Sequence, residues 1–170
     1  MTNALRAKEA VRVWPARPTG APTHLALGAI ELMGAGRLFK QAPQSRAEIH
    51  GALVKGLPYA LLVTLVDQLT ALSAEQVADA VGISARTLRR RQKDHTGKPM
   101  PADLASKTWQ FAEILAQASA GCGSRDAAER WMARPAMGLD GALPVELLRT
   151  LQGSELVTEF LGRLEHGVYT

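Results

Sequence analysis

Residues 75–93 read EQVADAVGISARTLRRRQK, and this stretch decides the fold of the 170-residue chain. Apolar residues recur at helical spacing on both sides of Gly82, and glycine readily adopts the positive φ that a sharp turn between helices needs. Ser73, with Gln76 three residues later, precedes the first helix, and Ser84 opens the second, so both helix starts carry capping residues. The small Ala78 allows the helices to cross closely. The stretch therefore predicts a helix-turn-helix whose buried seam is Val77, Val81, Ile83 and Leu88.

The outer face of the second helix is basic. We take Leu88 as the inward direction and rotate by about 100° per residue. Arg86, Arg90 and Lys93 then point outward. Guanidinium groups pair with guanine edges and phosphates, and the free N–H groups of a first helical turn can hold a phosphate. The predicted DNA-binding residues are Ser84, Arg86, Thr87, Arg89, Arg90 and Lys93. An ordinary helical hairpin with a solvated basic face is the alternative interpretation.

Arg91 departs from this pattern. It falls on the partly inward side of the helix, where such motifs usually carry an apolar residue. We expect its methylene stem to pack there while the guanidinium extends to solvent.

The rest of the chain also reads as helical, because no run shows sustained alternation of apolar and polar residues. Upstream, residues 1–22 contain three prolines and are expected to form a loose arm. The expected upstream helices lie within residues 21–38, from the Ser45 cap to about Val54, and over residues 59–72. Downstream, residues 94–101 read as a linker. The expected downstream helices are residues 102–118, a helix from the Ser124 cap through Met132, residues 144–151 ended by Gly153, and a last helix capped by Ser154 that reaches about His166. We therefore predict an all-α fold.

The charge is unevenly distributed along the chain. Residues 1–98 hold 14 Lys and Arg against 7 Asp and Glu, a net of +7, and residues 99–170 hold 6 against 9, a net of −3, which together give +4. Such asymmetry is typical of a half that meets a polyanion and a half with another task. We expect a flexible arm over residues 1–22, a helix-turn-helix domain for DNA binding and dimerisation over residues 23–98, and a second helical domain over residues 99–170.

Composition argues against several classes of protein. Cys122 is the only cysteine, which excludes an intrachain disulfide and a cysteine metal cage. The uncharged run of residues 56–66 is far shorter than the roughly 20 residues of a membrane span. Of the four histidines, none lies three or four residues from another, and Asp126 and Glu129 read as solvated charges at a helix start. We expect no catalysis, no metal and no cofactor, and a cytoplasmic protein.

The final helix carries an apolar stripe, and the chain then ends with an aromatic residue, Tyr169. Because an aromatic side chain near a terminus implies that something buries it, the tail either docks on its own domain or binds a partner. The stripe residues are Leu156, Val157, Phe160, Leu161 and Leu164.

The C-terminal pattern resembles the toxin-binding region of the MbcA/ParS/Xre antitoxins, which are partners of RES-domain toxins. The resemblance covers roughly residues 40–170 and includes the upstream segments 56–58 and 86–90. The matching C-terminal positions are Trp131, Pro135, Leu139, Gly141, Pro144, Leu147, Leu148, Thr150, Gly153, Val157, Leu161, Arg163, Leu164, Gly167, Val168 and Tyr169.

This resemblance implies a type II antitoxin of a bacterium. The toxin would attack NAD, by degradation or by ADP-ribosylation, and the C-terminal tail would obstruct its active site. The helix-turn-helix would bind and repress the operon's own promoter. Trp131, Pro135, Leu147 and Leu148 are expected to be structural. The candidate toxin-binding residues are Arg163, Glu165, His166, Gly167, Val168, Tyr169 and Thr170.

A stand-alone transcription regulator, whose C-terminal half only dimerises or senses a ligand, remains the alternative. A symmetric homodimer is expected in both cases, because two recognition helices fit a palindromic operator. The apolar helix over residues 59–69 and the N-terminal arm are the two candidate dimer surfaces.

Overall fold

The computed structural model describes residues 24–39, 43, 45–94 and 97–165, and these are all-α, as predicted. Within these ranges there is no strand, only an isolated bridge between Pro58 and Pro99, and no helix long and apolar enough to cross a membrane. The predicted arm and residues 166–170 lie outside the described residues. The elements are α1 (His24–Leu32), η1 (Ala35–Arg37), α2 (Arg46–Lys55), α3 (Tyr59–Asp67), α4 (Ala74–Val81), α5 (Ala85–Lys93), α6 (Ala102–Cys122), α7 (Arg125–Met132), η2 (Met137–Leu139), α8 (Pro144–Leu147) and α9 (Leu151–Glu165).

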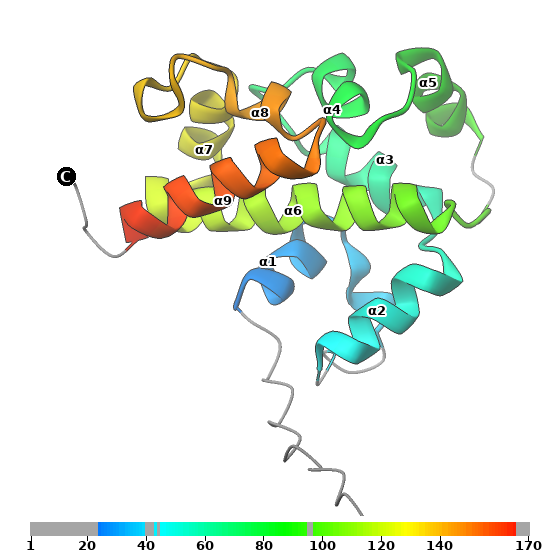
Figure 1. Cartoon of the computed structure of the whole chain (residues 1–170). Coiled ribbons are helices and arrows are strands. Elements are labelled where there is room, and N and C mark those ends of the chain that lie inside the picture. The colour runs from blue at the N-terminus through cyan, green and yellow to red at the C-terminus, as the bar shows by residue number, and fades with distance from the viewer. Residues whose placement is uncertain (1–23, 40–42, 44, 95–96, 166–170) are drawn as a thin grey trace, which may run out of the picture.

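Helix α6 is the central element of the fold. It runs across the molecule with α1 and α2 on one side, α3, α4, α5, α7 and α8 on the other, and α9 lying along it (Figure 1). Because α6 is covered on several sides, its buried residues are not confined to one stripe. The C-terminal segment packs on α6 through α7 and α9.

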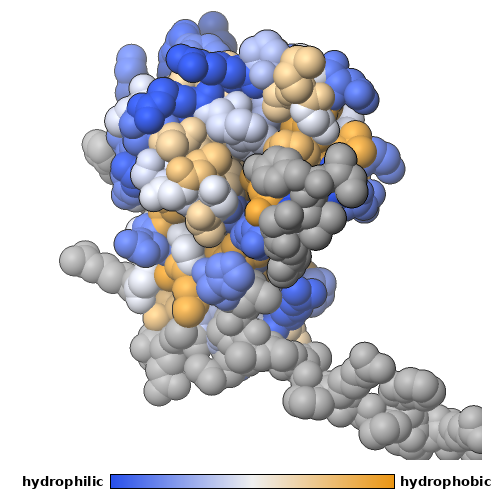
Figure 2. Space-filling view, turned by 90° about the vertical axis from the view of Figure 1, so that its left-hand side faces the viewer, coloured by the Kyte–Doolittle hydropathy of each residue, from blue (hydrophilic) through white to orange (hydrophobic). Residues whose placement is uncertain are grey.

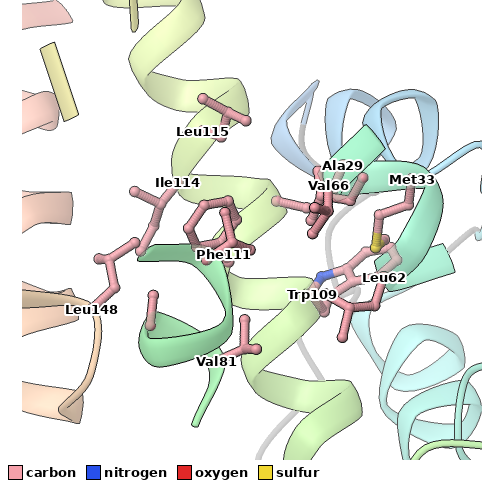
Figure 3. Close-up of a cluster of buried hydrophobic side chains, with 14 of the residues drawn as sticks. Ala29, Met33, Leu62, Val66, Val81, Trp109, Phe111, Ile114, Leu115 and Leu148 are labelled. Carbon is pink, nitrogen blue, oxygen red and sulfur yellow. The ribbon is translucent and has the colours of Figure 1, made fainter. Parts of the chain in front are cut away.

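One hydrophobic core joins the two halves of the chain. Phe111 on α6 is 2% exposed and lies between Val66 on one side and Val81 and Leu148 on the other (Figure 3). The apolar stripe of α3 faces this core, with Leu62 and other leucines buried, so most of that stripe is already covered within the chain.

The helix-turn-helix forms as predicted. The Ser73 side chain accepts from the backbone N–H of Gln76, whose side chain accepts from the N–H of Ser73, which completes the capping box of α4. Gly82 has φ 82° and ends α4 in the left-handed conformation. Leu88 is fully buried, as are Val77 and Val81, while Ile83 is partly buried against the core.

The expected linker between the halves is tied down where the structure describes it. The N–H of Met100 donates to the Leu57 carbonyl over 2.7 Å, and the N–H of Tyr59 donates to the Lys98 carbonyl over 3.0 Å. Met100 is buried. The prolines and glycine that suggested a loose segment instead form a short pairing with the start of α3, a partner that lies about forty residues away along the chain.

The start of the last helix was predicted wrongly. Helix α8 ends at Leu147, and α9 begins at Leu151 and continues through Gly153 and Ser154. The N–H of Gly153 donates to Thr150 Oγ1 over 3.0 Å, so Thr150 does the capping that we assigned to Ser154. A Cβ on Gly153 would lie 2.0 Å from the Leu147 carbonyl oxygen. The glycine therefore permits a close approach rather than ending a helix.

The end of α3 was also predicted wrongly, and the apolar stripe of the last helix divides into buried and exposed residues. Helix α3 ends at Asp67, before the expected Leu72, although Leu72 is still buried. On α9, Val157 and Leu161 are fully buried, but Leu156 is 52% exposed and does not belong to the core.

Candidate DNA- and toxin-binding surfaces

Helix α5 presents the predicted basic face. Ser84, Arg86, Arg89, Arg90 and Lys93 are exposed, and Thr87 is partly exposed. A shallow concavity is lined by five of the six predicted residues, namely Arg86, Thr87, Arg89, Arg90 and Lys93. The structure therefore brings these side chains together on one surface that is about two helical turns long.

The Ser84 side chain is hydrogen-bonded to the helix that it caps. Its Oγ accepts from the backbone N–H of Thr87 over 3.1 Å and lies 2.9 Å from Thr87 Oγ1. This cap stabilises the first turn of α5. A phosphate bound there would contact the backbone N–H groups of that turn that Ser84 does not use, together with the Ser84 and Thr87 hydroxyls.

Arg89 is held by a carboxylate from α4. Its guanidinium forms an ion pair with Glu75, and both side chains are more than half exposed. The pKa of Glu75 is lowered by a hydrogen bond that the carboxyl accepts from the backbone N–H of Glu75 itself, and by the neighbouring Arg89 guanidinium. Glu75 is thus ionised at neutral pH and orients Arg89, a partner that reasoning from α5 alone did not find.

Arg91 does not send its guanidinium to solvent, contrary to our expectation. The group lies 4.4 Å from the centre of the Tyr59 ring, and the side chain is 17% exposed. Arg91 Nη1 is also 3.4 Å from Asp94 Oδ2. The cation–π contact substitutes for the apolar residue usual at this position and joins α5 to α3.

A cleft between α4 and α8 is lined by residues of the helix-turn-helix and by residues of the C-terminal half. Arg149, which follows α8, lies 3.2 Å from Asp79 on α4. Both side chains are more than half exposed, so this ion pair adds little stability. The contact shows that the two halves share a surface as well as a core.

Glu129 was predicted to be a solvated charge at a helix start, and this prediction is wrong, because its side chain is fully buried. Its Oε2 accepts from the backbone N–H of Thr70 over 2.6 Å and of Ala71 over 2.8 Å, and its Oε1 lies 3.5 Å from Arg125 Nε. Glu129 thus satisfies two N–H groups of the connection between α3 and α4. Its position one turn before the buried Met132 was the available signal, since residues three apart share a helix face.

Of the predicted toxin-binding residues, the structure describes two. Arg163 and Glu165 are exposed on the last turn of α9. His166, Gly167, Val168, Tyr169 and Thr170 lie outside the described residues. Helix α5 and the end of α9 lie at opposite ends of the molecule (Figure 1), so the two predicted sets do not converge on one site.

The residues expected to be structural divide into two groups. Leu148 is buried, and Leu147 and Trp131 are partly buried against the core. Pro135 is exposed.

Two titratable side chains of the described chain, Cys122 and Glu113, have raised pKa values. No group of three His, Cys, Asp or Glu side chains among them could hold a metal ion. Burial raises the pKa of the Cys122 thiol, the opposite of what an activated nucleophile needs. Burial likewise raises the pKa of Glu113.

Comparison with protein families divides the chain into two matches. Residues 48–113 match the antitoxin Xre-like helix-turn-helix domain, and residues 115–167 match the antitoxin Xre/MbcA/ParS C-terminal toxin-binding domain. The first match contains α5 with its basic face, and the second contains α7, α8 and α9. The two matches meet within α6.

Several curated proteins named Antitoxin Xre are similar to the chain. The one from Pseudomonas putida strain KT2440 is 31% identical over 123 residues, which cover 71% of this chain and 72% of the relative. The one from Photorhabdus laumondii is 30% identical over 126 residues, covering 73% and 82%. The one from Yersinia enterocolitica is 30% identical over 132 residues, covering 75% and 86%.

Proposed function

The chain belongs to the Xre/MbcA/ParS family of antitoxins, and from this premise we propose that it neutralises a RES-domain toxin acting on NAD and represses its own promoter. The observation that carries the proposal is the placement of two different surfaces at opposite ends of one core (Figure 1). The basic face of α5 suits DNA, and the end of α9 leads into the tail. Because the surfaces are far apart, toxin and operator can be held at the same time.

The tail is proposed to obstruct the toxin's active site. Residues 163–170 would enter a pocket that binds the pyrophosphate of NAD and therefore carries positive groups. The net charge of −3 over residues 99–170 suits such a pocket. Within the tail we assign Tyr169 to stack where a ring of NAD would lie, and a Tyr169→Ala chain that still neutralises fully would refute that assignment.

Co-expression with the adjacent reading frame tests the antitoxin role. The neighbour is expected to arrest growth and lower cellular NAD when expressed alone, and to be silent beside the full chain. A chain truncated after Gly162 loses the tail and is expected to restore toxicity. A neighbour that is harmless by itself would favour the alternative, a transcription regulator whose C-terminal half dimerises or senses a ligand.

The DNA-binding role rests on Ser84, Arg86, Thr87, Arg89, Arg90 and Lys93. Arg86→Ala and Arg90→Ala are each expected to weaken binding to the chain's own promoter fragment. Each would reduce the slope of log affinity against log salt by about 1, because one phosphate or base contact is lost. Arg134→Ala is the matched control, since Arg134 is an exposed arginine that follows α7. Equal effects of all three changes would contradict the assignment.

A homodimer is part of the same proposal, because one recognition helix provides little affinity alone. Of the two candidate surfaces, the apolar stripe of α3 is mostly buried in the core, which favours the arm over residues 1–22. Deleting the arm should convert a dimer to a monomer in sedimentation. We further propose that residues 23–98 and 99–170 divide the work of DNA binding and toxin binding, with no enzymatic role for either.

A further inference from the structure

An aromatic stack lies on the outer side of α9. The Phe160 ring packs face to face on Trp131 of α7, with centroids 5.8 Å apart and an interplanar angle of 5°. The Arg163 guanidinium lies 5.9 Å from the centre of the Phe160 ring. Both rings are only partly buried, so the stack is also part of the surface.

Two strongly exposed apolar side chains extend this surface. Met137 is 91% exposed, and its neighbour Gly138 touches the Phe160 ring so closely that a Cβ there would lie 2.2 Å from it. Leu156 is 52% exposed and precedes Phe160 by one helical turn, so the two share a face of α9. We call this surface the α9 patch, which consists of Trp131, Met137, Leu156, Phe160 and Arg163.

The composition of the α9 patch is typical of a protein–protein interface. Trp, Phe, Met and Arg are enriched at such interfaces, and Trp and Arg are common among their energetic hot spots. On the side of the molecule where α9 ends, exposed apolar groups lie among hydrophilic ones (Figure 2). Within the described chain Met137 is left almost fully exposed and Leu156 about half exposed, which leaves both available to an occupant.

The toxin is the occupant that the position of the α9 patch favours. All five residues lie within the toxin-binding match, residues 115–167. The patch lies on the helix that continues into the proposed blocking tail, and the five residues after Glu165 reach at most about 17 Å when extended. A protein whose pocket receives the tail is therefore within reach of the patch.

We propose that the α9 patch is an anchor that holds the toxin while the tail obstructs its active site. The complementary toxin surface would be apolar where it meets Met137, Leu156 and the Phe160 ring. This inference rests on the proposed function, because it takes the toxin as the occupant.

Serine substitutions test the anchor with little risk to the fold, because the substituted side chains are exposed. The double variant Met137→Ser/Leu156→Ser is expected to bind the purified neighbouring RES-domain protein at least about tenfold more weakly than the full chain. Leu151→Ser is the matched control: Leu151 is 60% exposed on the same helix and lies about 140° away from Leu156 around it. Its affinity is expected to change by less than about twofold.

Truncation after Glu165 separates anchor from tail. The truncated chain is expected to retain measurable toxin affinity through the α9 patch, and adding the two serine changes should abolish it. Equal affinity of the full chain and the double variant would overturn the anchor and leave the antitoxin role intact. Failure of the full chain to bind would remove the proposed function and the anchor together.

Sedimentation of the free chain tests whether a second copy of the chain, rather than the toxin, occupies the α9 patch. A double variant that becomes monomeric while keeping full toxin affinity would assign the patch to a dimer and overturn the proposal. An unchanged oligomeric state with weakened toxin binding is the expected result.

Discussion

Helices α4 and α5 and helices α8 and α9 are two helix pairs with similar residues near their junctions, and their structures differ. In the first pair Gly82 ends one helix with φ 82° and Ser84 caps the next. In the second pair Gly153 and Ser154 both lie inside α9 and are buried. The boundary there falls at Thr150, whose hydroxyl caps the helix.

The difference shows that glycine serves two separate physical needs. At Gly82 the backbone adopts a conformation that other residues rarely adopt. At Gly153 the conformation is helical, and the requirement is space for the Leu147 carbonyl. A local pattern identifies the first need, because it arises within the turn. It misses the second, because the need arises from how α8 approaches α9.

The largest expected effect concerns the support that the C-terminal half gives to the first helix pair. Glu129→Ala leaves the N–H groups of Thr70 and Ala71 without their acceptor just before α4. We expect a loss of about 3 to 4 kcal/mol in the free energy of unfolding, measured with urea. Asp126→Ala is the control, since Asp126 is exposed and its pair with Arg130 should contribute at most about 0.5 kcal/mol. Similar losses for both variants would show that the buried carboxylate has no special role.

The second prediction tests close approach in the second helix pair. Gly153→Ala is expected to cost about 2 to 3 kcal/mol, because the new Cβ would overlap the Leu147 carbonyl and force α8 away. Gly162→Ala lies on the same helix with nothing within 4 Å, and should stabilise by about 0.5 to 1 kcal/mol through helix propensity. Thermal unfolding of the two variants side by side measures both. Opposite signs are the expected outcome, and equal signs would contradict the packing explanation.

The third prediction concerns the turn of the first pair. Gly82→Ala must place a side chain at φ 82° and is expected to destabilise by about 1 to 2 kcal/mol. The loss should be smaller than that of Gly153→Ala, since the nearest neighbour of the new Cβ is the flexible end of Lys107. Equilibrium unfolding of both variants measures the two losses of stability. A larger loss for Gly82→Ala than for Gly153→Ala would mean that backbone strain costs more than steric overlap at these junctions.

The smallest effect is electrostatic and lies between α4 and α5. Because the pKa of Glu75 is lowered in the folded chain, its contribution to stability is complete above its ordinary pKa and is lost as pH falls through the lowered value. Arg89→Ala should raise the pKa of Glu75 only part of the way, since the hydrogen bond from its own backbone N–H remains. NMR titration of the Glu75 carboxyl follows this shift. A pKa that does not move would show that the ion pair is not maintained in solution.

Much of the candidate DNA site follows from residues close together in the chain. The spacing of Leu88, Arg86 and Arg90 on one helix places the charges outward, because helical geometry is local. The position of Arg91 over Tyr59 does not follow from spacing, since that ring is 32 residues earlier and is brought close only by packing of α3 on α5. On the toxin-binding side, the apolar stripe of α9 was recognisable. The separation of buried Leu161 from exposed Leu156 depends on where α6 lies.

By itself, the sequence determined the helix type, the turn at Gly82, the serine caps at Ser73, Ser84 and Ser124, and the basic face of α5. Each is governed by hydrogen bonds and sterics within a few residues. Only the tertiary structure decided the single core around α6, the burial of Glu129, the passage of α9 through Gly153 and the exposed α9 patch. These depend on contacts between segments far apart in the chain, whose free energy is realised only when the helices pack together.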